Sequence, residues 1–409
     1  MSKKRIAIFI DSRKKSGGVY HEILNTIEKI KKYNSDNLKF SIIVSSKKLD
    51  INLEKENIEL HYFSMNALER YICYLRNYGT LISRLKRLFF FQNKFENFLK
   101  KINVDVVYFP SASQYSLYLE DTKFIINIGD INHRENIEFP EVVDSSEFQR
   151  KDDIFRKSLP RALAIFTNAS IIKERISFFY GILKERIFLV NLHPSNPIKN
   201  FKNIDKEKQL KVREIHKLPK NYIFYPAMYL PHKNHKNLID ALKILKLNFK
   251  PDLKIVFCGN DNDVNYLKNL KTYVNKNNLN DSVTFLNFVD DDQLPYLYLD
   301  AFLLAMPTLM GPANIPPWEA FKMEVPVIYS ELEGIKEVFG DAVLYIDPLK
   351  PESIANGIKE IFQNTELKNN LIIKGKKRLD QIDYKTEFEQ FFKIIKEYRK
   401  LKQVWEFDS

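Results

Sequence analysis

The chain has 409 residues and carries 64 Lys and Arg against 52 Asp and Glu, a formal net charge of +12. Hydrophobic residues make up 44% and charged residues 28%, which excludes a disordered or fibrous chain, and the length allows two or three domains. The basic balance fits nucleic acid, an anionic membrane surface or an anionic small substrate, and does not choose among them.

The first residues and the cysteines indicate a cytoplasmic protein. Met1 to Asp11 hold a few lysines and one short apolar run, without the apolar stretch and cleavage site of a signal peptide. No run of about 18 apolar residues occurs, so no membrane-spanning segment is expected. Cys73 and Cys258 lack metal-ligand spacing and are expected to be small buried hydrophobes in a reducing compartment.

The first half alternates short β-rich runs with longer helical ones, which is typical of α/β chains with parallel sheets. Near-continuous apolar runs suit strands that are covered on both faces. These runs predict an N-terminal Rossmann-like domain over residues 1–195. Its predicted strands are Arg5–Ile10, Lys39–Val44, Ile58–Phe63, Asp105–Phe109, Lys123–Ile128, Ala162–Thr167 and Arg186–Val190.

Residues 196–220 lose this periodicity, collect Pro, Asn and Lys, and are expected to form an interdomain linker. The alternation then restarts and predicts a second Rossmann-like domain over residues 221–383. The tail, residues 384–409, is amphipathic and helical, and packing on the first domain is one place for its apolar face. The predicted strands of the second domain are Tyr222–Tyr225, Lys254–Cys258, Val283–Leu286, Ala301–Ala305, Pro326–Tyr329 and Ala342–Ile346.

The two serial sets of βα units predict an α/β fold of two doubly wound domains facing across a cleft. In such sheets ligands bind beyond the carboxyl ends of the strands, where the strand order reverses. Polar residues and glycines that follow predicted strands are therefore the candidates for a functional site.

Two segments of the first half meet this condition. Gly17 and Gly18 lead into a helix, where backbone N–H groups can approach an anion, although a glycine pair is also an ordinary turn. Asp130 and His133 follow the strand Lys123–Ile128 and are candidates to touch a ligand. Polar loop residues of this kind also serve as turn and cap residues.

In the second half, Lys233 lies on the loop after the first strand of that domain, where a lysine is placed as a point charge for phosphate oxygens. Lys236 is the second choice in the same loop. A plain solvated loop is the alternative, since lysine is abundant throughout the chain.

The most informative segment runs from Pro307 to Ala320. Gly311 and Pro312 follow a strand, and Pro316 and Pro317 then open a helix, where proline is tolerated. The N–H groups of Asn314 and Ile315 are thereby free to face a diphosphate. Glu319 is expected in the first helical turn, where the dipole favours a carboxylate, either to hold sugar hydroxyls or as a plain first-turn charge.

Taken together, these segments resemble the large retaining glycosyltransferase family of bacterial polysaccharide and lipopolysaccharide enzymes, commonly called family 4, with the GT-B fold. The resemblance covers most of the chain, is strongest from Tyr225 to Pro348, and is most specific in the stretch from PPWEAF to PVIYSE. The resemblance implies that Glu319 binds the nucleotide ribose, that Lys233 binds the donor diphosphate, and that the backbone around Ala313, Asn314 and Ile315 helps to hold the phosphates. It also implies that Gly17 and Gly18 border the donor phosphate and the acceptor. Asp130 or His133 would lie near the transferred sugar.

The chain departs from the family pattern at two places. The family has a pair of glutamates eight positions apart, and here Gly311 stands at the first of them, which puts the identity of the sugar, or activity itself, in question. An arginine ahead of the lysine is also absent, because Ala227 and Met228 occupy that region. The form Gly-Pro-x-Asn-Ile-Pro-Pro nevertheless resembles a variant among polysaccharide enzymes, which favours an active enzyme.

The resemblance therefore implies a hexosyltransferase that moves a sugar from a nucleoside-diphosphate sugar to a saccharide or lipid-linked acceptor, with retention and without metal or cofactor. The run Asp290–Asp292 is expected to cap the next helix rather than bind a metal. A nucleotide-sugar epimerase and a catalytically silent subunit of the same fold are the rival interpretations. Nucleic acid is not an expected partner, because the basic residues are dispersed and no reader motif occurs.

Membrane contact is a separate hypothesis. The segment Leu81–Ile102 mixes lysines and arginines with phenylalanines and leucines, as do helices that lie in a lipid interface and reach lipid-linked acceptors. Its apolar residues suit packing on the sheet equally well. The expected location is the cytoplasm, with peripheral contact on the inner face of the membrane as the open alternative.

Overall fold

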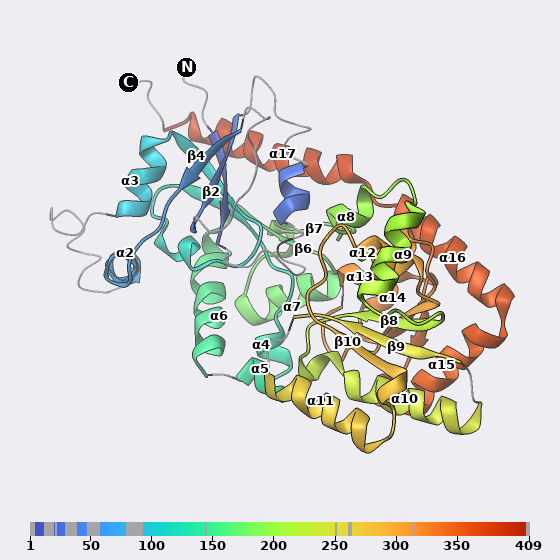
Figure 1. Ribbon diagram of the computed structural model, residues 1–409. Coiled ribbons are helices and arrows are strands. Elements are labelled where there is room, and N and C mark those ends of the chain that lie inside the picture. The colour runs from blue at the N-terminus through green and yellow to red at the C-terminus, as the bar shows by residue number, and fades with distance from the viewer. Residues whose placement is uncertain are drawn as a thin grey trace. The chain divides into compact units, whose positions relative to one another are not determined.

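The computed structural model describes residues 5–11, 20, 23–28, 39–46, 58–78, 93–143, 145–249, 252–260, 264–312 and 314–405. The chain divides into two compact units. The first holds Met1–His133, Ser145–Val190 and Asp383–Ser409, and the second holds Arg134–Asp144 and Asn191–Ile382. Figure 1 labels their elements.

The first unit is built on a parallel sheet whose strands are β1 (Arg5–Ile10), β2 (Lys39–Val44), β3 (Glu59–Tyr62), β4 (Val104–Phe109), β5 (Lys123–Asn127), β6 (Ala164–Thr167) and β7 (Ile187–Leu189). Among the described residues their order is β3-β2-β1-β4-β5-β6-β7. Ile6 to Ile10 of β1 are each at most 1% exposed, which is the burial expected of a parallel strand covered on both faces. The order reverses between β1 and β4, the place where such sheets hold ligands.

The second unit repeats this plan with β8 (Tyr222–Pro226), β9 (Lys254–Cys258), β10 (Val283–Leu286), β11 (Leu303–Met306), β12 (Val327–Ser330) and β13 (Leu344–Ile346). In the described part of the chain these strands pair in parallel in the order β10-β9-β8-β11-β12-β13. Every one of these strands overlaps a predicted one, so the predicted α/β class with two doubly wound sheets is confirmed.

Helices occupy the connections between the strands (Figure 1). Within the described ranges, no helix is both long and apolar enough to cross a membrane. The helices are α2 (Ala67–Tyr78), α3 (Lys94–Lys101), α4 (Asn132–Glu135), α5 (Pro140–Val143), α6 (Ser145–Ser158), α7 (Ser170–Tyr180), α8 (Asn196–Lys199), α9 (Lys206–Ile215), α10 (His235–Asn248), α11 (Val264–Lys276), α12 (Leu294–Leu299), α13 (Ile315–Lys322), α14 (Ile335–Phe339), α15 (Pro351–Gln363), α16 (Thr365–Asp380) and α17 (Tyr384–Lys402).

The segment 196–220, expected as a linker, differs from that expectation: it belongs to the second unit and contains α8 and α9. Val212 on α9 is 2% exposed, and Arg213 forms an ion pair of 2.8 Å with Asp300, just after α12. Gln209 donates to the same carboxylate over 2.6 Å. A short helix held by polar side chains carries little hydrophobic periodicity, so the sequence pattern did not reveal it.

The C-terminal helix α17 packs on the sheet of the first unit (Figure 1, red). Phe391 and Ile395 belong to the core cluster with residues of β1, β2 and β4, and the Phe391 ring lies 5.5 Å from that of Tyr108 at 73°. Asp105 at the start of β4 is 4% exposed and accepts hydrogen bonds from Arg399 and Lys402 on α17. The helix therefore contributes both apolar and charged contacts to this unit.

The segment Leu81–Ile102 is described only from Asn93 onward; residues 81–92 lie outside the described residues. Its described end forms α3, in which Phe95 and Leu99 are fully buried and the Phe95 ring lies 5.2 Å from Phe9 of β1. Lys100 of this helix forms an ion pair with Asp121. In this part of the segment, the apolar side chains pack on the sheet.

Candidate functional site

The site residues predicted from the sequence fall into three groups. Gly17, Gly18 and Ala313 lie outside the described residues. Lys233, Gly311, Asn314, Ile315 and Glu319 all lie in the second unit, on loops that leave β8 and β11 and on the helix α13. Asp130 and His133 lie in the first unit.

The loop after β8 places Lys233 at the end of a short turn, Pro231–Lys233, directly before α10. The Lys233 side chain is half-buried, and its Nζ lies 3.4 Å from Asn314 Oδ1 at the start of α13. A lysine that reaches across to a helix N-terminus brings two positive features together, since the N-terminus carries the positive end of the helix dipole. This pair of features favours an anion.

Asn234 fixes this loop to two others. Its backbone is left-handed with φ 59°, a conformation that Asn tolerates better than most residues, and its side chain is 6% exposed. Its Nδ2 donates to the carbonyl of Pro307 over 3.0 Å, after β11, and to that of Pro348 over 2.7 Å, after β13. The loop carrying Lys233 is therefore tied to the carboxyl ends of two further strands.

The carbonyl of Lys233 is held as well. The buried Tyr225 hydroxyl donates to it over 2.8 Å, and the Leu309 N–H donates to the carbonyl of the preceding His232 over 2.8 Å. Burial raises the pKa of Tyr225 well above its ordinary value, so the hydroxyl keeps its proton and remains a donor. The backbone beneath Lys233 is thus fixed before any ligand arrives.

Gly311 has a backbone φ of 91°, which favours glycine, and a Cβ there would lie 3.3 Å from Asn314 Nδ2. The Gly311 carbonyl accepts from Asn314 Nδ2 and from the Tyr329 hydroxyl, each over 3.3 Å. Asn314 Nδ2 also donates to the Tyr329 hydroxyl over 2.6 Å. The amide of Asn314 is therefore oriented with its oxygen toward Lys233 and its nitrogen toward Gly311 and Tyr329.

The helix α13 begins after Asn314, whose side chain makes no capping bond to the helix. Pro316 and Pro317 lie in the first turn and have no N–H to offer. The backbone N–H groups that the helix start can direct at an anion are therefore those of Asn314 and Ile315, as the sequence indicates.

Glu319 differs from its expected place. It lies in the second turn of α13 and is 4% exposed. Its carboxylate accepts from the Tyr298 hydroxyl over 2.6 Å and from the Ser195 N–H over 3.3 Å, so it joins α13 to α12 and to the residue before α8. Since each carboxylate oxygen can accept more than one hydrogen bond, these contacts leave acceptor capacity for a ligand hydroxyl.

Glu141 was not singled out by the sequence. It lies on α5, and its Oε1 accepts from the His232 N–H over 2.9 Å and lies 2.6 Å from His232 Nδ1. Burial would raise the pKa of the Glu141 carboxyl, but the hydrogen bonds from His232 outweigh burial and lower it. The two residues are 91 positions apart, so no spacing signal in the sequence connects them.

The two candidates of the first unit differ from each other. Asp130 is partly buried, and its Oδ1 accepts from the Asn132 N–H over 3.2 Å at the start of α4. His133 is 1% exposed, lies 2.9 Å from the Tyr180 hydroxyl, and packs edge-on against Phe155 at 5.0 Å. Asp130 is accessible in this conformation, whereas His133 is a core residue of its unit.

Within the described part of the chain, no group of three or more His, Cys, Asp and Glu side chains converges as metal ligands. The run Asp290–Asp292 does not supply the cap residue of α12 as expected: the cap residue is Gln293, whose side chain makes no bond to the helix start. Asp292 instead forms an ion pair of 2.8 Å with Lys208 of α9.

Residues 206–378 match the protein family described as glycosyl transferases group 1. Over 210 residues the chain is 27% identical to the O-antigen chain mannosyltransferase RfbU of Salmonella typhimurium, covering 51% of this chain and 54% of that protein. It is 25% identical over 361 residues to the capsular polysaccharide biosynthesis glycosyltransferase CapH of Staphylococcus aureus, covering 86% and 89%. The matched region thus spans about half the length of RfbU and most of CapH.

Solved structures share the fold. A crystal structure of Anabaena HepE in complex with UDP and glucose superposes with a TM-score of 0.71 at 17% identity, covering 96% of this chain and all of that one. The structure of WaaG, a glycosyltransferase involved in lipopolysaccharide biosynthesis, gives a TM-score of 0.68 at 13% identity, covering 93% and 96%.

Proposed function

The chain has the GT-B fold and carries a glycosyl transferases group 1 domain over residues 206–378, and from this we propose that it transfers a hexose from a nucleoside-diphosphate sugar to a saccharide or lipid-linked acceptor. We place this reaction in the synthesis of a cell-surface polysaccharide, in line with the names of RfbU and CapH. The observation that carries the proposal is the approach of Lys233 Nζ to Asn314, 3.4 Å apart at the start of α13.

Lys233 and the start of α13 would act on the leaving diphosphate. As the bond to the sugar breaks, negative charge grows on the phosphate oxygens, and a fixed ammonium and the N–H groups of Asn314 and Ile315 stabilise it without rearranging. Because the Lys233 backbone is held by Tyr225 and Asn234, little reorganisation accompanies the step. We expect retention at the anomeric carbon and no requirement for a metal.

The remaining roles are proposed from the resemblance and, where the residues are described, from their contacts. Glu319 is proposed to accept from a ribose hydroxyl while keeping its bond to Tyr298. Asp130 is the proposed contact of the transferred sugar from the first unit, because His133 would first have to leave Tyr180 and Phe155. Gly17 and Gly18 are proposed to border the donor phosphate and the acceptor, and Ala313 to help hold the phosphates.

The identity of the donor is open to direct measurement. RfbU is named a mannosyltransferase, and the HepE crystal holds UDP and glucose. We therefore propose thermal unfolding of the full chain with nucleoside diphosphates of each base and with their glucose and mannose conjugates. A ligand at one hundred times its Kd stabilises the folded state by about 2.7 kcal/mol.

Three variants make this test specific. Lys233→Ala and Glu319→Gln are expected to lose the stabilisation by the nucleotide, whereas Lys236→Ala is expected to keep it. Lys236 is the matched control because it lies three residues from Lys233, in the first turn of α10, but is exposed and pairs with Asp240 on the same helix. Equal stabilisation in Lys233→Ala and Lys236→Ala would rule out the proposed diphosphate site.

A second candidate function is a catalytically silent subunit that binds nucleotide. Gly311 favours this function, because the family that the sequence resembles has a carboxylate at that position. The backbone there has φ 91°, a conformation that glycine adopts readily. Nucleotide binding without release of nucleoside diphosphate, in the presence of donor sugars and a panel of acceptors, would support this function. Steady release with a donor and an acceptor would support the transferase, and conversion of a donor without acceptor would indicate an epimerase.

We further propose a cytoplasmic location with peripheral contact on anionic membrane. The contact would come from the basic and aromatic segment 81–102, although its described end packs inward. Flotation with vesicles containing about one third anionic lipid at low salt tests it, since screening weakens such binding at higher salt. Protein that stays at the bottom of the gradient at low salt would remove membrane contact from the proposal.

A further inference from the structure

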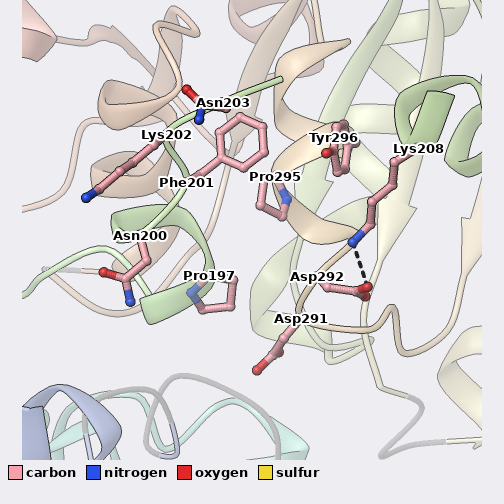
Figure 2. A pocket seen from close by; sticks show the side chains of 10 residues that line it. All are labelled: Pro197, Asn200, Phe201, Lys202, Asn203, Lys208, Asp291, Asp292, Pro295 and Tyr296. Atoms are coloured by element: carbon pink, nitrogen blue, oxygen red, sulfur yellow. Dashed lines mark hydrogen bonds and ion pairs between the residues drawn. The ribbon is translucent and has the colours of Figure 1, made fainter. Parts of the chain in front are cut away.

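A pocket of about 530 Å³ lies in the second unit between the segment after α8 and the start of α12 (Figure 2). It shares no lining residue with the cluster around Lys233 and Glu319. Two aromatic rings line it, those of Phe201 and Tyr296, which meet edge-on at 5.4 Å and 88°. Pro197 and Pro295 complete its apolar part. Tyr296 is 4% exposed and Phe201 is half-buried, so the ring that a ligand can reach is that of Phe201.

The polar lining of this pocket carries balanced charge. The lining includes two lysines, Lys202 and Lys208, and two aspartates, Asp291 and Asp292. Lys208 pairs with Asp292 over 2.8 Å (Figure 2, dashed line). The Lys208 ammonium also lies 5.9 Å from the centre of the Tyr296 ring. The two positive and two negative charges of this lining sum to zero, so it favours neither an anion nor a cation strongly.

The pocket also offers directional hydrogen-bonding groups. The exposed amide of Asn200 supplies both donors and an acceptor, and the Asp291 carboxylate supplies acceptors only. A ligand that fits these groups and the Phe201 ring needs one apolar face and several hydroxyl groups at its edge, and no net charge. Pyranose sugars have this construction: their C–H faces stack on aromatic rings while their hydroxyls lie in the plane.

We infer that this pocket is a saccharide-binding site, separate from the donor site, that holds a neutral part of the acceptor or product chain. The inference rests on the proposed function in so far as the enzyme handles a saccharide chain. The volume lies in the range typical of small-ligand sites, about 300–1,000 Å³. The segment that builds one wall of the pocket is the region that the sequence pattern suggested to be a linker.

The test is saturation-transfer NMR on the full chain with linear trisaccharides of glucose, galactose and mannose. Phe201→Ala removes the stacking ring, and Asp291→Asn removes a charge at nearly constant volume. Each is expected to weaken trisaccharide binding, Phe201→Ala by about tenfold, the loss expected when a stacked aromatic ring is removed. Phe178→Ala is the matched control, because Phe178 is an aromatic residue of the first unit with 82% exposure.

Two outcomes would overturn the inference: no saturable binding of any trisaccharide up to about 10 mM, the weak end of specific recognition, or equal affinities in Asp291→Asn, Phe201→Ala and Phe178→Ala. Thermal stabilisation by nucleotide is measured on the same samples. If the wild type binds nucleotide but no trisaccharide, this site alone is rejected. If the wild type binds no nucleotide, the proposed function is rejected. Asp291→Asn keeps the test valid if Phe201→Ala does not fold.

Discussion

Gly311 shows how one residue constrains what the site can contain. Its carbonyl accepts two hydrogen bonds, from Asn314 and Tyr329, and its φ of 91° is a conformation that side chains disfavour. The family that the sequence resembles has a glutamate at this position, and its carboxylate is missing here. The loop is therefore built around the glycine, and restoring the carboxylate would strain it.

We expect Gly311→Glu to lower the free energy of unfolding by roughly 1–3 kcal/mol, because a side chain is forced into a strained backbone conformation and against Asn314. It is expected to reduce nucleotide binding rather than improve it. Urea unfolding and nucleotide titration measure both. Gly181→Glu is the control, since Gly181 has φ 65° but nothing within 4 Å of its would-be Cβ. A Gly311→Glu variant more stable than Gly181→Glu would contradict this account.

His235 makes stability depend on pH. Its ring is fully buried between Tyr225 and Phe257, at 5.1 and 5.0 Å. Burial, reinforced by the nearby charge of Lys233, lowers its pKa to about 3. The unfolded chain, with a pKa of about 6.5, takes up a proton that the folded chain does not, so stability is retained above that pH and lost below it.

The expected loss from this histidine is about 1.4 kcal/mol per pH unit between about pH 6 and pH 4. His235→Phe has no such proton to take up and is expected to lose less stability on acidification. Urea unfolding of both proteins at pH 7 and pH 5 measures the difference, expected to be about 2 kcal/mol. The same fall in stability for both proteins would show that another group causes the acid sensitivity.

At the scale of elements, the loop carrying Lys233 is held through three strand ends rather than by its own sequence. Asn234 donates to carbonyls after β11 and after β13, and Tyr225 of β8 holds the carbonyl of Lys233. Parallel strands end at one edge of a sheet, so residues far apart in the chain meet there. The position of the ammonium is therefore a property of the sheet edge as a whole.

We expect Asn234→Ala to lower the free energy of unfolding by roughly 2–4 kcal/mol, because the Pro307 carbonyl loses its side-chain donor, the Pro348 carbonyl keeps only the one from Asn237, and alanine disfavours φ 59°. It is expected to weaken nucleotide binding although Lys233 is retained. Asn237→Ala is the control, since Asn237 makes one bond to the Pro348 carbonyl and is less buried. Unchanged nucleotide affinity in a folded Asn234→Ala protein would show that this residue does not position Lys233.

The sequence predicted the elements better than their contacts. The strands were found because buried parallel strands are apolar runs bounded by polar turns, as in β1 and β9. The sequence did not predict the burial of His133 or the bond from His232 to Glu141, because both depend on partners far away in the chain. Glu319 was placed one turn early, since the helix begins at Ile315, before the prolines.

At the scale of the whole molecule, α17 is the last described helix of the chain and yet part of the first unit's core.

We expect Asp105→Ala to lower the free energy of unfolding by about 1–3 kcal/mol, because Arg399 and Lys402 lose their partner but keep access to water. It is also expected to speed proteolytic cleavage within α17. Asp121→Ala, which breaks the exposed pair with Lys100, is expected to change stability by less than about 1 kcal/mol. Equal effects of the two variants would rule out a role for Asp105 in holding α17.

The path of the chain has a consequence for biosynthesis. The strands of the first unit are complete at Leu189, but the helix that covers one part of its core starts at Tyr384. At roughly 5–20 residues per second, a ribosome needs roughly 10–40 s to make the intervening second unit. During that interval the nascent first unit exposes the apolar surface on which Phe391 and Ile395 later pack. Vectorial folding therefore cannot finish the N-terminal half first, and chaperone engagement during translation is expected at this face.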